Sequence, residues 1–221
     1  MTGLKQVTPI RRKDGVSHEE FLQHYQGVHI PNVLQHMKPD RYAVSIFDPR
    51  DGRAPYAGMA SLFWEDAEAA EAVTGRNTSP VVATDSFIER IELPLGQLRV
   101  VEHVIVPGPT GGPATKDERE SAFKMTFLVS PRPGESFDDI QRHWLELHAP
   151  NVASNFVADG GVRYVVNLVQ PGTGEPSLVG VAELSYRDRD AAKGHHIADD
   201  GFNAKTTGIA LPGRELIQAP R

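Results

Sequence analysis

The sequence predicts an α+β fold, in which two ferredoxin-like βαββαβ repeats pack their antiparallel sheets together as a barrel of about eight strands. Two observations support this prediction. Residues 17–33 and 136–152 align without a gap, 119 positions apart. A similar order of strand and helix patterns surrounds each copy. The period indicates duplication of a whole domain, because solenoid and propeller repeats span only about 20–50 residues.

The duplication divides the 221-residue chain into two repeats and a linker. We expect residues 1–106 to form the first repeat and residues 121–221 the second. Residues 107–120 contain three prolines and three glycines beside a charged run, which is typical of a linker. Each repeat has roughly the 100 residues that a small domain needs for a core of its own.

Composition excludes several functional classes. The chain carries a net charge of −6, so nucleic acid is not an expected partner. It has no cysteine, which excludes disulfides and thiolate chemistry. No run of about 18 apolar residues is present, and residues 1–6 lack the apolar core of a signal peptide. We therefore expect a cytoplasmic protein with no membrane segment.

Each repeat gives the same series of patterns. In the first repeat, strands are expected at 4–10, 41–47, 56–64 and 98–106, and helices at 17–33, 65–73 and 80–87. In the second, strands are expected at 123–130, 162–169, 178–186 and 214–218, and helices at 137–155 and 188–198. Such a unit places both helices on one face of an antiparallel sheet, and the second copy covers the other face.

Pro31 and Pro150 lie inside the first helix of each repeat. Proline lacks the backbone donor and clashes with the carbonyl four residues earlier, so each helix should kink or break there. This places an unpaired acceptor close to His29 in the first repeat and to His148 in the second.

His29 and His148 are the leading catalytic candidates. On a helical wheel each lies at the edge of the buried stripe, and imidazole exchanges protons near neutral pH. The alternative is a packed histidine bonded to the backbone near the proline. Tyr42 and Tyr164, on the following strand, are placed to reach the same pockets and to assist proton transfer.

Other side chains are candidates for substrate binding, each with a structural alternative. Tyr25 and Trp144 would form either the core or the wall of a pocket for a flat molecule. Asn32 and Asn151 would either cap the kinked helix or orient a substrate oxygen. Arg41 and Arg163 would hold a carboxylate or form salt bridges.

His195 and His196 precede two aspartates in a stretch for which we identify no counterpart in the first repeat. At i, i+4 spacing His195/Asp199 and His196/Asp200 would meet on a helix and form an acid/base pair. Two histidines without a third ligand are weak support for a metal site, and none is predicted. The alternative is a polar helix end.

The helix pattern resembles the EthD family of the dimeric α/β-barrel superfamily. The resemblance is carried by Phe-x-x-His-Tyr-x-x-x-His-x-Pro at 21–31 and Ile-x-x-His-Trp-x-x-x-His-x-Pro at 140–150. It implies a pseudo-dimer, in which the two halves of one chain imitate a homodimeric barrel, with pockets between the helices and the sheet of each half. The superfamily includes cofactor-free monooxygenases, cyclases, isomerases, decarboxylases, dehydratases and haem enzymes.

These observations together predict a cofactor-independent enzyme. The expected reaction is proton transfer (isomerisation, dehydration, cyclisation or decarboxylation) on a small hydrophobic carbonyl, phenol or lactone metabolite. No cofactor is predicted. A non-catalytic carrier and a haem enzyme are the alternatives, and the pseudo-dimer could pair again as a homodimer. The extra histidines favour the second half as the active one.

Overall fold

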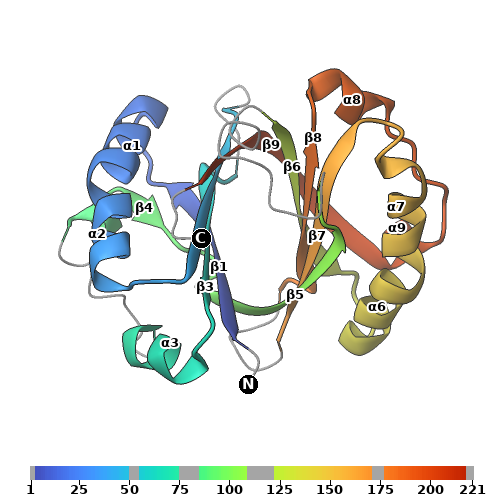
Figure 1. The fold of residues 1–221 in the computed structure, drawn as a ribbon, viewed down its shortest axis with the longest axis horizontal. Helices are drawn as coiled ribbons and strands as arrows, with labels where there is room; N and C mark the ends of the chain where they lie inside the picture. Colours follow the sequence, from blue (N-terminus) through green and yellow to red (C-terminus); the bar gives the residue numbers. More distant parts are fainter. Residues whose placement is uncertain (1–2, 50–54, 75–84, 109–121, 171–176, 218–221) are drawn as a thin grey trace. The chain divides into compact units, whose positions relative to one another are not determined.

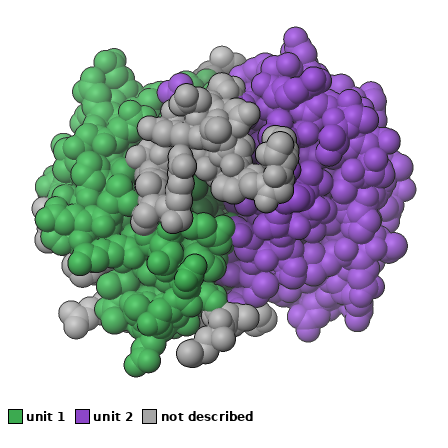
Figure 2. Space-filling view, viewed as in Figure 1, with its two compact units in different colours: residues 1–99, 216–221 green, residues 100–215 purple. Residues whose placement is uncertain are grey.

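The computed structural model describes residues 3–49, 55–74, 85–108, 122–170 and 177–217. The chain divides into two compact units, which are coloured separately in Figure 2: residues 1–99 with 216–221, and residues 100–215. Each unit is an antiparallel sheet whose helices lie on one face (Figure 1). The α+β class predicted from the sequence is therefore correct for each unit.

The first unit follows the predicted order of elements. It contains β1 (Leu4–Arg12), α1 (His18–His24), the π-helical turn η1 (Tyr25–His29), α2 (Ile30–His36), β2 (Arg41–Phe47), β3 (Gly58–Trp64), α3 (Ala67–Thr74), the 3₁₀ turn η2 (Phe87–Glu89) and β4 (Ile91–Glu92). Antiparallel pairing gives the strand order β4-β1-β3-β2. Of the helix predicted over 80–87, residues 80–84 lie outside the described residues, and Phe87 begins the 3₁₀ turn instead.

The second unit repeats this order. It contains β5 (Leu98–Val106), β6 (Phe123–Pro131), α6 (Phe137–His143), the π-helical turn η4 (Trp144–His148), α7 (Ala149–Phe156), β7 (Gly161–Val169), β8 (Gly180–Tyr186), α8 (Arg189–Gly194), α9 (Phe202–Lys205) and β9 (Thr206–Ile217). The strand order is β9-β6-β8-β7-β5. The last strand begins eight residues before its predicted start, and the helix predicted over 188–198 ends at Gly194.

Strand β5 belongs to the second unit, although the sequence assigns it to the end of the first repeat. Its residues Val100 to Val106 pair antiparallel with β7. The compact units therefore divide at 99/100, while the duplicated sequence divides near residue 106. The repeat boundaries and the linker stay a prediction, and most of the linker lies outside the described residues.

A hydrophobic core fills the space between the sheet and the helices of each unit. In the first unit Phe21 and Tyr25 pack with Val44 and Leu62. In the second unit Ile140 and Trp144 pack with Val166 and Leu184. Because the helix stripe supplies one side of each core, the residues beside that stripe lie where the helix meets the sheet.

The long helix of each unit changes to a π-helical turn just before its proline. The turns cover Tyr25–His29 and Trp144–His148, and the amide after each turn donates to the carbonyl five residues earlier. Pro31 and Pro150 cannot supply the next α-helical donor, which favours this local change. A kink or break was predicted at the prolines; the helices instead continue through them after a π turn, a feature that is frequent at functional sites.

Candidate functional site

A cavity of about 440 Å³ lies in the second unit, between its helices and its sheet. Helical residues Trp144, His148 and Val152 border it from one side, and Tyr164 and Leu184 border it from the sheet. The segment from Ile197 to Gly208 completes the lining. Its volume is within the range of roughly 300–1,000 Å³ that small-molecule sites occupy.

His148 and Asp200 form a dyad at this cavity. The His148 Nδ1 atom lies 2.9 Å from Asp200 Oδ2. Asn151 donates to the same carboxylate oxygen at 2.9 Å and to the Ala198 carbonyl at 2.7 Å. The π turn and the following helix thus present His148 and Asn151 to one aspartate, which fixes the imidazole relative to the cavity.

A short turn holds Asp200 in place. The Phe202 amide donates to Asp200 Oδ1 at 3.0 Å, and Gly201 between them has a φ of 80°, a conformation that suits glycine. The Phe202 ring stacks on the His148 ring, with centroids 4.1 Å apart and planes inclined by 13°. The turn therefore supplies both the carboxylate and an apolar face for the histidine.

Burial and hydrogen bonds set the protonation states at this site. Burial lowers the pKa of His148 below its ordinary value of 6.5, against an opposing effect of Asp200. Burial alone would raise the pKa of Asp200, but hydrogen bonds from Asn151, the Phe202 amide and His148 lower it to about 2. Burial raises the pKa of Tyr164 well above 10. At neutral pH the site combines a carboxylate, a neutral imidazole and a phenol.

The first unit contains the same arrangement around His29. The His29 Nδ1 atom lies 2.8 Å from Asp85 Oδ2, to which Asn32 donates at 3.3 Å. The Phe87 amide donates to Asp85 Oδ1 at 3.0 Å, and its ring stacks on His29 at 4.0 Å. The adjacent cavity, however, measures only about 40 Å³. The dyad is duplicated, and the large cavity is a feature of the second unit.

The sequence did not predict the two aspartates and two phenylalanines as partners of His29 and His148, and it paired Asp200 with His196 instead. They lie in Ala83-Thr84-Asp85-Ser86-Phe87 and Ala198-Asp199-Asp200-Gly201-Phe202, which share an Ala-x-Asp-x-Phe pattern. Ser86 has a φ of 60°, matching the left-handed conformation of Gly201. The expectation that the second stretch has no counterpart is therefore wrong for Asp200, while Pro80 and Val81 stand at the positions of His195 and His196. The shift in spacing between the halves, from 119 to 115 positions, concealed the pattern.

Most of the predicted site residues lie at these two places. Trp144 and Tyr164 border the large cavity, and the Trp144 Nε1 atom donates to the Tyr164 hydroxyl at 3.4 Å. Tyr42 borders the small cavity, and Tyr25 is fully buried in the core beside it. Asn32 and Asn151 donate hydrogen bonds to Asp85 and Asp200. This contact differs from both roles that the sequence suggested, capping of the helix and orientation of a substrate oxygen.

Four predicted binding residues lie elsewhere. Arg41 is exposed with its guanidinium over the Phe63 ring, and Arg163 does not border the large cavity. His195 binds Asp159 at 3.0 Å, and His196 is exposed. The i, i+4 pairing predicted on a helix is wrong, because α8 ends at Gly194 and Asp200 binds His148 instead.

The described part of the chain lacks two further features. Within it, no group of three or more His, Cys, Asp or Glu side chains is arranged to hold a metal ion. None of the described helices is long and apolar enough to cross a membrane.

Comparison with known protein families gives a match in the first half of the chain. Residues 13–80, which include α1, His29 and β2, match the model of the EthD domain. The predicted resemblance is thereby confirmed, and the His29–Asp85 dyad has its histidine within the matched EthD segment. No curated protein matches the chain.

Several solved structures share the fold of this chain along nearly its whole length. An anthrone oxidase-like protein aligns with a TM-score of 0.65 at 9% identity, covering 100% of this chain and 95% of its own. A putative monooxygenase of Fusobacterium nucleatum aligns with a TM-score of 0.61 at 10% identity, covering 97% of this chain and 93% of its own. A mutant chlorite dismutase of Candidatus Nitrospira defluvii aligns with a TM-score of 0.53 at 8% identity, covering 99% of this chain and 91% of its own. The TM-scores establish a shared fold, and at these sequence identities the likeness shows the fold alone.

Proposed function

We propose that the chain is an enzyme that moves protons on a small hydrophobic carbonyl, phenol or lactone bound in the cavity of the second unit. One observation carries the proposal: the His148–Asp200 dyad borders a cavity of about 440 Å³. The equivalent His29–Asp85 dyad borders only about 40 Å³. The second half is therefore the proposed active half, and the first supplies structure.

His148 is the proposed general base. When Nδ1 donates its proton to Asp200, the lone pair on Nε2 is left to accept a proton from substrate. Asn151 and the Phe202 amide hold the carboxylate that orients the ring. A positioned base of this kind contributes roughly 10²–10⁴-fold to a rate.

Tyr164 is the proposed partner of the substrate oxygen. Its oxygen accepts the Trp144 N–H, so its own proton can be donated to a ligand. Because burial raises its pKa, the phenol stays protonated at neutral pH. A neutral donor near a base suits removal of a proton next to a carbonyl, where negative charge develops on oxygen. Isomerisation, dehydration and cyclisation use this step, and decarboxylation next to a carbonyl develops the same charge on oxygen as carbon dioxide leaves.

The remainder of the cavity favours an apolar ligand with few polar groups. Phe127, Val129 and Leu184 contribute apolar surface, and Trp144 and Phe202 contribute aromatic surface. Asn203, Thr206 and Thr207 add polar side chains to the lining. This composition is that of a site for a small, largely hydrophobic molecule.

Oxidation of the same substrate class is a second candidate. The proteins of shared fold include one named anthrone oxidase-like and one named a putative monooxygenase. Removal of a proton from an acidic carbon produces a carbanion, which is also the species that dioxygen oxidises. The same His148 would therefore begin either reaction, and uptake of dioxygen distinguishes the two.

The matched variants His148→Gln and His29→Gln test the proposal. The protein is incubated in D₂O with a panel of ketones, phenols and lactones that includes anthrone, and deuterium uptake and dioxygen consumption are measured. We expect His148→Gln to abolish turnover and His29→Gln to retain it, with both variants folded. Equal activity in the two variants would contradict the assignment. A ligand retained in native mass spectra without turnover would favour the carrier, and a Soret band would favour a haem enzyme.

A further inference from the structure

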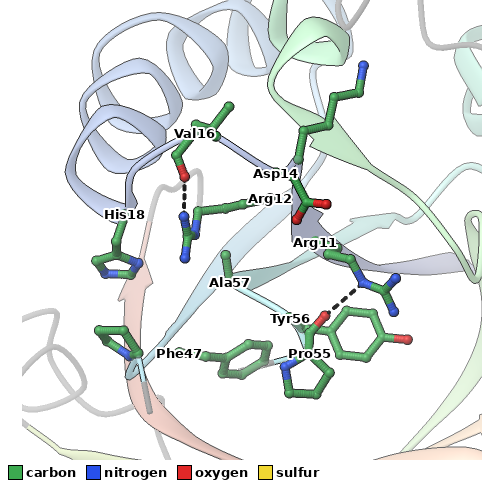
Figure 3. Close-up of a pocket in the computed structure, with 12 residues that line it drawn as sticks. Arg11, Arg12, Asp14, Val16, His18, Phe47, Pro55, Tyr56 and Ala57 are labelled. Carbon is green, nitrogen blue, oxygen red and sulfur yellow. Dashed lines mark hydrogen bonds between the residues drawn. The ribbon is translucent and has the colours of Figure 1, made fainter. Parts of the chain in front are cut away.

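We propose that the first unit carries a second binding site, for a small molecule bearing a phosphate group. The site is a cavity of about 300 Å³ at the end of β1, shown in Figure 3. The end of β1, the turn before α1, the end of β2 and the residues before β3 form its walls. None of its lining residues borders the His29 cavity, so the two sites are separate.

The lining carries an excess of positive charge. Arg11, Arg12 and Lys13 follow one another in the sequence and all border the cavity, whereas Asp14 is its one lining carboxylate among the described residues. His18 at the start of α1 borders it as well. The formal charges of these lining residues sum to about +2, which would offset the negative charge of a phosphate near neutral pH.

The three cations are positioned by neutral groups. Arg12 Nη1 donates to the Val16 carbonyl, as Figure 3 shows. Arg11 Nε donates to the Pro55 carbonyl at 3.1 Å, and Lys13 Nζ donates to the Ile88 carbonyl at 2.8 Å. A carbonyl orients a cation without cancelling its charge, and a guanidinium carries five N–H donors.

Among the described residues, Glu92 is a further carboxylate near this group, but it neutralises little. Arg11 Nη1 is 3.7 Å from Glu92, and both side chains are nearly half exposed. Ion pairs of this kind are weak, because solvent screens them. Arg11 therefore keeps the capacity to bind an anion.

The second unit supplies an internal comparison, because its backbone is equivalent at this place. The Ala57 amide donates to the Ile10 carbonyl at 2.8 Å, and the Val179 amide donates to the Val129 carbonyl at 2.7 Å. The next turn contains Gly15 in one unit and Gly134 in the other, with φ of 86° and 87°. The equivalent positions can thus be compared one by one.

Only one of the three cations recurs in the second unit. Ser130 and Pro131 stand at the positions of Arg11 and Arg12, and Arg132 stands at the position of Lys13. Phe137 replaces His18. Since the same turn forms with a single cation in the second unit, the cluster of three is a property of the first half and is not required for folding.

The dimensions indicate a small phosphorylated molecule. A cavity of about 300 Å³ admits a single ligand, and the net charge of −6 disfavours a polyanion such as nucleic acid. Phe47, Pro55 and Tyr56 form an apolar side of the cavity, visible in Figure 3 below the arginines. A phosphate on the cations and an apolar portion against these side chains would fill it.

Isothermal titration calorimetry of the full chain with inorganic phosphate at low ionic strength tests the proposal, with succinate as the carboxylate comparison. We expect saturable binding of one phosphate per chain. Arg12→Gln and Lys13→Gln should each weaken it roughly ten- to hundredfold, since each removes a charge-assisted hydrogen bond. Arg142→Gln makes the same charge change on an exposed side chain of α6 and should leave binding unchanged.

Each other outcome overturns the proposal. Absence of saturable phosphate binding, equal weakening by Arg142→Gln, or no weakening by Arg12→Gln and Lys13→Gln would exclude a site at this cavity. Succinate binding more tightly than phosphate would exclude phosphate as the ligand class. Shifts of the Gly15 and Val16 amide resonances on addition of phosphate to the wild-type chain provide a readout that does not depend on any variant folding.

Discussion

His148 Nδ1 lies 2.9 Å from Asp200 Oδ2, and this contact fixes which imidazole nitrogen is left for a ligand. The carboxylate has a pKa of about 2, so it stays ionised and accepts the Nδ1 proton across the neutral range. His29 stands in the same relationship to Asp85, at 2.8 Å. The two halves differ in the space beside the dyad, and this difference is what separates their proposed roles.

Asp200→Asn should lower turnover by roughly 10–100-fold, the usual effect of removing a group that orients a functional histidine. An amide no longer holds the imidazole in one tautomer and no longer raises the pKa of His148. The acidic limb of the kcat/KM profile should therefore move to lower pH, while KM changes little. Kinetics across pH 4–8 provide the measurement.

Asp85→Asn is the matched control for that experiment. It makes the same change at the dyad of the first unit, where the cavity is about 40 Å³. Activity should stay within about twofold of wild type. A loss equal to that of Asp200→Asn would show that both dyads catalyse the reaction.

The pH dependence of the wild type follows from the lowered pKa of His148. Because the neutral imidazole is the proposed base, activity should be constant above the ordinary value of 6.5 and decline only below it. Stability should follow the same sign: as pH falls through 6.5 the unfolded chain takes up a proton before the folded one, so folding weakens. An NMR titration of His148 Cε1–H should give a midpoint below 6.5. A midpoint above 6.5 would exclude the proposed protonation state.

The two cavities predict opposite responses to one substitution. Ala182 and Ala60 occupy equivalent positions, on β8 beside the large cavity and on β3 beside the small one. Ala182→Leu should fill empty space, leave stability nearly unchanged and weaken ligand binding. Ala60→Leu has no such space and should destabilise by about 1–3 kcal/mol. Urea denaturation and ligand titration of the two variants make the comparison, and equal stability losses would contradict it.

Local rules were sufficient to predict much of the fold from the sequence. Ser17 and Ser136 cap their helices as expected, accepting from the Glu20 and Asp139 amides. Each proline changes the helix locally, although as a π turn where a kink or break was predicted. These features depend on residues a few positions apart, so a sequence pattern contains all the information that they require.

The acidic partner of each histidine was not predicted, because it depends on a contact more than 50 residues away in the chain. The spacing of His196 and Asp200 would bring them together on a helix. Because α8 ends at Gly194, these residues are not helical and the spacing does not pair them. The placement of β5 in the second unit likewise depends on pairing with β7, a long-range choice that the strand pattern of β5 does not encode.

Lys124 provides a test of the buried polar groups on the sheet of the second unit. Its side chain is 3% exposed and its Nζ atom pairs with Glu215 and, at 2.5 Å, with Glu183. Asn167 donates to Glu183 at 2.7 Å. Burial alone would lower the pKa of Lys124, but the two carboxylates more than offset it, so the pKa is raised and the ammonium persists.

Lys124→Met should therefore destabilise the protein by about 3–5 kcal/mol, because it leaves two carboxylates buried without their cation. Lowering the pH should recover part of this loss, as protonation neutralises the carboxylates. Lys193→Met is the control, since Lys193 pairs with Asp190 on an exposed helix surface, where solvent screens the pair, and its loss of stability should be far smaller. Urea unfolding of both variants at pH 7 and pH 5 gives the measurement. If the two variants lose the same stability, the charge cluster around Lys124 is not what holds these strands.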